Sequence, residues 1–162
     1  MLNKTSVSSW RGWAVALAAL ISAGAAGWLY LGEQPGPAGL LRPDDAGLVA
    51  EGAAVYKENC AACHGDNLQG EDNWRSRKPD GRMRAPPHDQ SGHTWHHDDK
   101  LLFNLTKFGL AKTAGLKDYE TDMPAYDGVL SDRQITAVLS FIKSRWPAEI
   151  RAHHDTLNQQ PK

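Results

Sequence analysis

The sequence predicts a small all-α domain with long loops, preceded by one N-terminal transmembrane helix. Two observations predict the all-α domain. Three segments carry apolar residues at helical spacings of three and four, and no segment of useful length alternates apolar and polar residues as a strand does. A third observation predicts the membrane helix, because residues 12–32 form a run of 21 residues without a formal charge.

The uncharged run is long enough to cross a membrane. As a helix it would extend about 31 Å, and a hydrocarbon core measures about 30 Å. Lys4 and Arg11 precede the run, which by the positive-inside rule leaves the N-terminus in the cytoplasm and exports the rest of the chain. A cleavable signal peptide is the alternative, since Ala23-Gly24-Ala25 resembles a cleavage site, but the apolar run continues beyond it. We therefore expect residues 1–32 to be an uncleaved anchor.

The rest of the chain divides into three parts. Residues 33–45 are rich in proline and glycine and are typical of a semi-flexible linker. We expect one domain over residues 46–150, followed over residues 151–162 by a polar C-terminal tail in which His153 and His154 have no specific role. The formal net charge of the chain is −1, which gives no indication of a nucleic-acid partner.

Two short helices are predicted in the first part of the domain. The first covers residues 46–59, with an inward face formed by Val49, Gly52, Ala53 and Tyr56. The second covers residues 98–108 and stops at Gly109. Its inward face is formed by Leu101, Leu102, Leu105 and Phe108.

The last helix has the clearest signals. Ser131 is its N-cap, and Gln134 three residues later completes a capping-box pattern. Pro147 ends the apolar stripe that follows, which consists of Ile135, Val138, Leu139, Ile142 and Trp146. Three short helices make a small core for a domain of this length, so we expect another apolar body to fill its centre.

Two long loops separate the predicted helices. Residues 65–92 are polar and rich in Gly, Pro, Asp and Asn, and residues 110–130 contain Met123-Pro124. Loops of this length inside a small domain are usually functional. We expect them to wrap around a bound group.

The motif CAACH, residues 60–64, contains both cysteines of the chain. Zinc needs four ligands, and a histidine directly after the second cysteine is unusual for a zinc knuckle. A thioredoxin-type disulfide needs a βαβ context, and a structural disulfide across two residues closes too small a loop to stabilise much. Haem uses all three residues, because the thiols of Cys60 and Cys63 add to its vinyl groups and His64 ligates the iron. C-x-x-C-H in an exported chain therefore predicts one covalently bound haem c.

Further residues stand around this motif in a fixed order. Gly52 and Tyr56 precede it, Met123-Pro124 follows it, and Phe141 lies in the last helix. In this pattern, over about residues 46–147, the chain resembles the class I c-type cytochromes. The resemblance implies a compact fold in which the first and last helices cross near Gly52 and Phe141. It also implies that His64 is the proximal ligand of the iron and Met123 the distal one.

The position of Met123 gives an independent reason to expect it as a ligand. It lies in a loop just before the last helix, where a chain wrapped around the haem can return to its other face. Met1 precedes the anchor, and Met83 is flanked by two arginines, which is a poor setting for an apolar thioether. The alternative is a core-filling methionine, but His/Met ligation recurs in cytochromes c.

The stretch PPHDQSGHTWHH contains four histidines, His88, His93, His96 and His97, without regular ligand spacing. A copper or zinc site is the alternative, but the resemblance implies that this loop serves the haem. The carbonyl of Pro86 or Pro87 would then accept a hydrogen bond from Nδ1 of His64. Trp95 would pack at the haem edge, where its indole N–H can reach a propionate. Arg84 replaces the more usual apolar residue before Ala-Pro-Pro.

These features predict an electron carrier rather than an enzyme. The haem, ligated by His64 and Met123, would pass single electrons between redox partner proteins on the periplasmic side of the inner membrane, held there by a single-pass anchor. The chief rival is a haem c subunit of a larger membrane oxidase or dehydrogenase complex. Two further rivals are a haem sensor or peroxidase, in which Met123 leaves the iron, and a copper-handling protein that uses the histidine loop.

Overall fold

The computed structural model describes residues 39–160, and the statements below concern that part of the chain. The expected anchor of residues 1–32 and the first part of the expected linker lie outside the described residues. Every helix within the described range is too short or too polar to cross a membrane.

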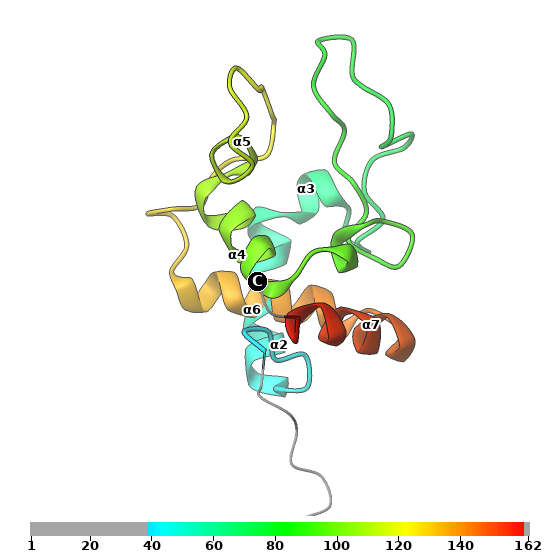
Figure 1. Ribbon diagram of the computed structural model, residues 1–162, viewed down its shortest axis with the longest axis vertical. Helices are drawn as coiled ribbons and strands as arrows, with labels where there is room; N and C mark the ends of the chain where they lie inside the picture. The colour runs from blue at the N-terminus through cyan, green and yellow to red at the C-terminus, as the bar shows by residue number, and fades with distance from the viewer. Residues whose placement is uncertain (1–38, 161–162) are drawn as a thin grey trace, which may run out of the picture. The chain divides into compact units, whose positions relative to one another are not determined.

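The described residues form helices joined by long loops, which confirms the all-α prediction for this range (Figure 1). Its strand-like pairing is limited to one isolated bridge between Arg77 and Met83. The helices, in chain order, are α2 (Ala46–Asn59), α3 (Ala61–His64), η1 (Thr94–His96), α4 (Asp99–Phe108), α5 (Leu110–Thr113), α6 (Asp132–Ser144) and α7 (Ala148–Asn158).

The helices predicted from periodicity begin at side-chain caps. The carboxylate of Asp45 accepts the N–H of Leu48 at the start of α2, at 3.0 Å. Asp98 caps α4 in the same way. The capping box predicted for Ser131 and Gln134 is present at the start of α6. These caps satisfy N–H groups that have no partner inside their own helix, which explains why each helix begins where it does.

The inward faces differ from the predicted ones by small rotations. In α2, Leu48 and Val55 are buried with Gly52 and Tyr56, while Val49 and Ala53 are only partly buried. In α4, the buried residues are Asp99, Leu102 and Thr106, and the remaining predicted positions are partly exposed. The apolar pattern therefore located the helices but did not give their exact orientation.

Helices α2 and α6 cross in direct contact at Gly52, as the resemblance implied. A Cβ atom on Gly52 would overlap the carbonyl oxygen of Ala137 and lie 2.9 Å from Cβ of Phe141. A glycine at this position lets the two backbones approach closely. Among the described helices, α2 and α6 are the pair in most extensive contact.

The polar tail expected from residue 151 is helical instead. Residues 151–158 form most of α7, and the side chain of His154 is 0% exposed. Its Nε2 donates to the carbonyl of His97 at 2.9 Å, and its ring packs edge-on against Trp146. The prediction that His154 has no specific role was therefore wrong, because its hydrogen bonds join α7 to the loop before α4.

The end of the expected linker is also packed against the domain. Leu41 is buried, and its N–H donates to the carboxylate of Asp99 at 3.0 Å. The N–H of Arg42 donates to Oγ of Ser140 at 2.9 Å. These contacts attach residues 41 and 42 to α4 and α6, so the linker prediction does not hold over that stretch.

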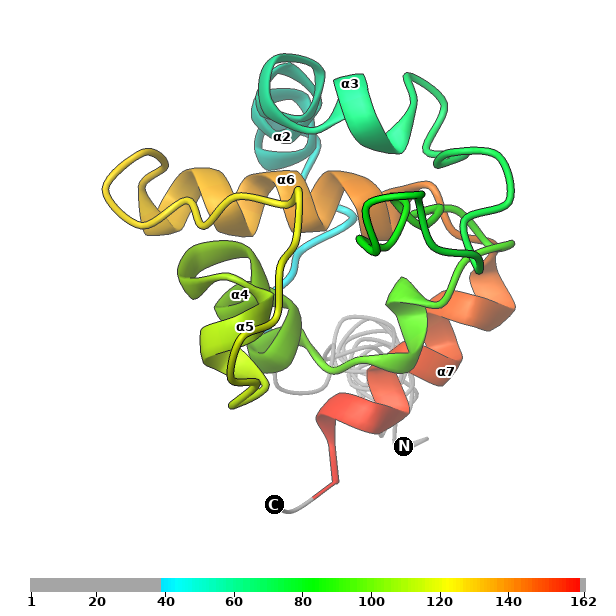
Figure 2. The same ribbon diagram turned by 90° about the horizontal axis from the view of Figure 1, so that it is seen from above.

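Seen from above, α2 and α3 lie on one side of α6, and α4 and α5 lie on the other (Figure 2). Both long loops extend in the same direction from these helices (Figure 1). In the same view, the loop after α5 passes in front of α6 before it joins the start of that helix (Figure 2). The CAACH turn and the segment that contains Met123 therefore belong to the same end of the domain.

Candidate functional site

The CAACH motif occupies the junction of α2 and α3. Cys60 is the residue between the two helices, and its carbonyl accepts the N–H groups of Cys63 and His64 at 3.2 and 2.9 Å. Both thiols are free, with Cys60 partly buried and Cys63 exposed. This single turn places two thiols and one imidazole within a few residues of one another on a fixed backbone.

The Cys60 thiol is not prepared for disulfide exchange. Burial raises its pKa to about 11, and the neighbouring Cys63 adds to this effect. Reactive redox cysteines have lowered pKa values, because the thiolate is the nucleophile. The thioredoxin-type alternative therefore has no support from the environment of this residue.

His64 is oriented by the loop that follows it. The residue is 7% exposed, and its Nδ1 lies 2.8 Å from the carbonyl oxygen of Pro86. A carbonyl only accepts hydrogen bonds, so Nδ1 carries the proton and Nε2 retains its lone pair. Burial lowers the pKa of His64, which favours the neutral ring that a metal requires. Of the two prolines considered from the sequence, Pro86 makes this contact, and the Pro87 carbonyl accepts from Thr94 instead.

Two tyrosines brace the CAACH turn. The hydroxyl of Tyr56 donates to the carbonyl of Gly65 at 2.9 Å, and that of Tyr126 donates to the carbonyl of Asn59 at 2.6 Å. Burial, with Cys60 and Cys63 nearby, raises the pKa of Tyr126 to about 12, so this hydroxyl stays protonated and continues to donate. Because Tyr126 is three residues after Met123, its bond ties the methionine loop to the CAACH turn.

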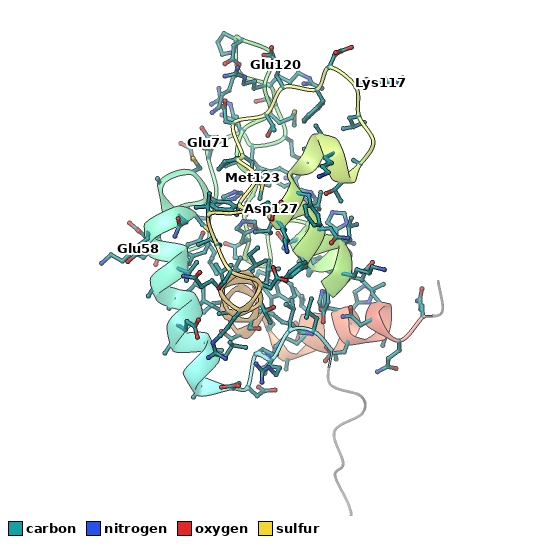
Figure 3. The ribbon with its side chains drawn as sticks, turned by 90° about the vertical axis from the view of Figure 1, so that its left-hand side faces the viewer. Glu58, Glu71, Lys117, Glu120, Met123 and Asp127 are labelled. Carbon is teal, nitrogen blue, oxygen red and sulfur yellow. The ribbon has the colours of Figure 1, made fainter. Side chains whose placement is uncertain are left out.

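Met123 is partly buried on the loop between α5 and α6. Figure 3 shows it near the middle of the domain, below the loop tip marked by Lys117 and Glu120. Its N–H donates to the hydroxyl of Thr121 at 3.1 Å. The backbone of Met83 instead pairs with Arg77 in the preceding loop. Met123 thus comes from the loop that returns over α6.

Ion pairs join the two long loops. Asp122, the neighbour of Met123, lies 3.0 Å from Lys78 and 3.0 Å from Arg82. Arg82 also reaches Glu120 at 3.4 Å. The hydrogen bond from Lys78, followed by its charge and that of Arg82, lowers the pKa of Asp122, so its carboxylate stays ionised at neutral pH. The loop that holds Pro86 is therefore linked by charge to the loop that holds Met123.

The indole of Trp95 has a buried N–H with no hydrogen-bond partner among the described residues. Its ring packs against the hydrophobic core and stacks on His96 at 3.7 Å between centroids. Leaving a buried donor unpaired costs about 1–3 kcal/mol. A carboxylate of a bound group, such as a haem propionate, would satisfy it. Together with the free thiols and the oriented His64, this donor makes the residues present a good fit for haem c.

The four histidines of the loop point to different partners. His88 bonds through Nδ1 to Thr94 at 2.8 Å, and its ring stacks on that of His64. His93 stacks on Trp74, and His97 lies edge-on to His93. Over residues 39–160, no three side chains of His, Cys, Asp or Glu gather in an arrangement that could hold a metal ion.

Sequence reasoning missed two residues of this site. His88 has no feature that separates it from the remaining histidines of the loop, and only the fold shows which one reaches His64. Tyr126 follows Met123 by three residues, and that proximity was the one signal available. Both act through contacts between segments far apart in the chain.

Comparisons with known proteins agree with the site. Residues 49–146 match the family model described as Cytochrome c. The chain is 36% identical over 98 residues to the Cbb3-type cytochrome c oxidase subunit CcoP of Azospirillum sp. (strain B510), a match that covers 60% of this chain and 29% of that subunit. The CcoP subunit of Azospirillum brasilense is 59% identical over 29 residues, which are 18% of this chain and 10% of that subunit.

The matched region spans less than a third of the length of either relative. No solved structure gives a significant match. The family model covers more than half of the chain, from within α2 to Trp146, two residues beyond the end of α6. The chain therefore belongs to the cytochrome c family.

Proposed function

We propose that this protein transfers single electrons through one covalently bound haem c. The observation that carries the proposal is the CAACH turn, where two free thiols lie beside a buried His64 whose Nδ1 is hydrogen-bonded to Pro86. Haem held at this turn supplies an iron that gains and loses one electron without a change in its protein ligands.

The chain's own residues have distinct tasks in this proposal. Cys60 and Cys63 hold the porphyrin by thioether bonds. Nε2 of His64 and the sulfur of Met123 would be the protein's two ligands to the iron. Ligation by both side chains would leave no position on the iron for a substrate. The protein then acts as a carrier between redox partners, which is the non-enzymatic role expected from the sequence.

A redox titration followed by optical spectroscopy tests this function. The full-length protein, purified from a host that attaches haem c, should show a single reversible one-electron transition. Its ferrous form should not bind carbon monoxide at neutral pH, because Met123 keeps the sixth position. Rapid carbon monoxide binding, or turnover of peroxide, would favour a sensor or a peroxidase instead.

A second candidate function is that of a haem c subunit in a larger membrane oxidase complex. The observation that favours it is the match to two CcoP subunits of cbb3-type cytochrome c oxidases. Purification of the native protein in mild detergent separates the two candidates. Stoichiometric recovery of oxidase subunits would support a permanent subunit, and recovery of this chain alone would support a mobile or anchored carrier.

We also propose that residues 1–32 anchor the protein in the inner membrane and that the haem domain faces the periplasm. Support comes from the uncharged run and the basic residues that precede it. The intact protein should sediment with membranes and resist a high-salt wash. Proteolysis within residues 33–38, before the packed segment at Leu41, should release a soluble coloured domain. A mature N-terminus near Ala26 would contradict the anchor.

A further inference from the structure

We propose that His88 is a positioning residue for the iron ligand His64. The two imidazole rings stack with their centroids 3.9 Å apart and their planes inclined by 22°. His88 thus covers one face of the His64 ring and limits how far that ring can tilt. The inference rests on the proposed function, in which His64 binds the iron.

The hydrogen bond from His64 to Pro86 does not fix the ring by itself. The bond restrains one atom, Nδ1, at 2.8 Å from the carbonyl oxygen. The outer torsion of a histidine side chain is broad, and a carbonyl accepts hydrogen bonds over a wide range of directions. A ring held only at Nδ1 can still tilt out of its plane. A flat group packed on its face removes that freedom.

His88 can do this because its own position is fixed. Its Nδ1 lies 2.8 Å from the hydroxyl of Thr94, which is 6% exposed. Its backbone N–H donates to the carbonyl of Leu68 at 2.8 Å, and its carbonyl accepts the indole N–H of Trp146 at 2.7 Å. The three partners of His88 lie in the loop after α3, in η1 and in the segment after α6. Three separate parts of the chain therefore hold the stacked ring in place.

Hydrogen bonding by His88 also distinguishes this residue from simple core filling. An aliphatic side chain would pack against His64, but it would offer neither a flat face nor an acceptor or donor for Thr94. The stack extends from His64 through His88 to the edge of Tyr56, whose ring centroid lies 6.3 Å from that of His88. Tyr56 in turn holds the carbonyl of Gly65, next to His64. The ligand is thus enclosed by groups that restrain each other.

The test compares variants of the full-length haem protein by electron paramagnetic resonance and by redox titration. The g-values of low-spin ferric haem depend on the orientation of the axial imidazole. His88→Leu should shift or broaden these g-values and change the reduction potential. His88→Phe, which retains a flat ring, should remain closer to the wild type. Thr94→Val, which releases His88 without removing it, should broaden the signal.

His93→Leu is the matched control, because His93 is an exposed histidine of the same loop that stacks on Trp74 rather than on His64. It should leave the g-values and the potential unchanged. Wild-type g-values and potential in both His88→Leu and Thr94→Val would overturn the inference. If His88→Leu does not fold, Thr94→Val and His88→Phe decide the matter by the same readouts. Failure of the proposed function would look different, since the wild-type protein would then lack covalent haem or a low-spin signal.

Discussion

The two ring nitrogens of His64 are not equivalent, and this difference determines what the residue can bind. Nδ1 donates to the Pro86 carbonyl, so Nε2 is the nitrogen with a free lone pair. Met123 is tied to the same site less directly. Its N–H bonds to Thr121, its neighbour Asp122 pairs with Lys78, and Tyr126 bonds to the CAACH turn. The position of Met123 therefore depends on how its loop is held by these contacts.

Replacement of Met123 by alanine tests the proposed ligation of the iron by this residue. Without the thioether, the iron should become high-spin and its reduction potential should fall, because methionine ligation raises the potential of a haem iron. Optical spectroscopy and redox titration measure both changes. Met83→Ala, in the preceding loop, is the control and should have wild-type properties. The assignment is wrong if Met123→Ala stays low-spin at an unchanged potential while Met83→Ala does not.

Glu71 provides a pH-dependent brace for the segment that ends at Pro86. Its carboxylate accepts the N–H of Ala85 at 2.5 Å, and its own N–H donates to the carbonyl of Ala85 at 2.9 Å. The bond from Ala85, with help from Lys78 and Arg84, lowers the pKa of Glu71 below its ordinary value of 4.5. A carboxyl whose pKa is lower in the folded state stabilises the fold above its unfolded pKa. That contribution is lost as the pH falls through the folded value.

Glu71→Gln should therefore lower the free energy of unfolding at pH 7, by less than about 1 kcal/mol because the side chain is partly exposed. The difference from the wild type should shrink once the pH is taken well below 4.5, where the wild-type carboxylate is also protonated. Urea denaturation at both pH values measures it. Glu58→Gln, at an exposed position of α2, is the control. A difference that stays constant across this pH range would show that the carboxylate charge has no part in the brace.

At the level of elements, the crossing of α2 and α6 depends on one glycine. Alanine at Gly52 would bring its Cβ into the carbonyl of Ala137, and backbone cannot move aside as a flexible side chain can. We expect Gly52→Ala to destabilise the protein by about 1–3 kcal/mol, the usual cost of overpacking.

Gly47→Ala is a matched control in the same helix. Its Cβ would meet only the carboxylate of Asp45, at an ordinary contact distance of 3.6 Å. Alanine is the better helix former by about 0.8–1 kcal/mol, so this change should be neutral or stabilising. Thermal or urea unfolding of the two variants measures the contrast. Equal destabilisation by both would mean that the helix crossing does not require a glycine.

Caps and apolar periodicity were enough to predict α2, α4 and α6, but not α7. His154 is the buried residue of α7, and the helix is held by polar contacts as well as by Ile150, which packs on the core. A hydrophobic pattern does not reveal the polar contacts. Asn158 exchanges hydrogen bonds with Asp99, at 2.8 and 3.1 Å, and His154 bonds to the loop before α4. Lys143, 2% exposed on α6, pairs with Asp155 on α7. Asp, Asn, His and Lys are also typical of an exposed polar tail. The sequence alone therefore could not show that these residues form an interface.

At the level of the whole molecule, the CAACH motif and the proline carbonyl beside His64 were predictable, but the contacts between the two long loops were not. The thiols and the imidazole must be close in the chain to serve one porphyrin, so CAACH is a local signal. The ion pairs of Asp122 with Lys78 and Arg82 join residues about forty positions apart, and no spacing rule connects them. The stack of His88 on His64 is hidden in the same way. Contacts that depend on the path of two long loops become visible only in the folded chain.

The central claim is that Cys60 and Cys63 hold haem c, and the mass of one peptide tests it directly. Trypsin cuts after Lys57 and Arg75, so both cysteines and His64 lie on residues 58–75. Mass spectrometry of this peptide, taken from the native protein, should give the mass of the peptide plus one haem. The mass of the unmodified peptide with free thiols would contradict the claim. A mass lower by two hydrogen atoms, as for a disulfide, would contradict it as well.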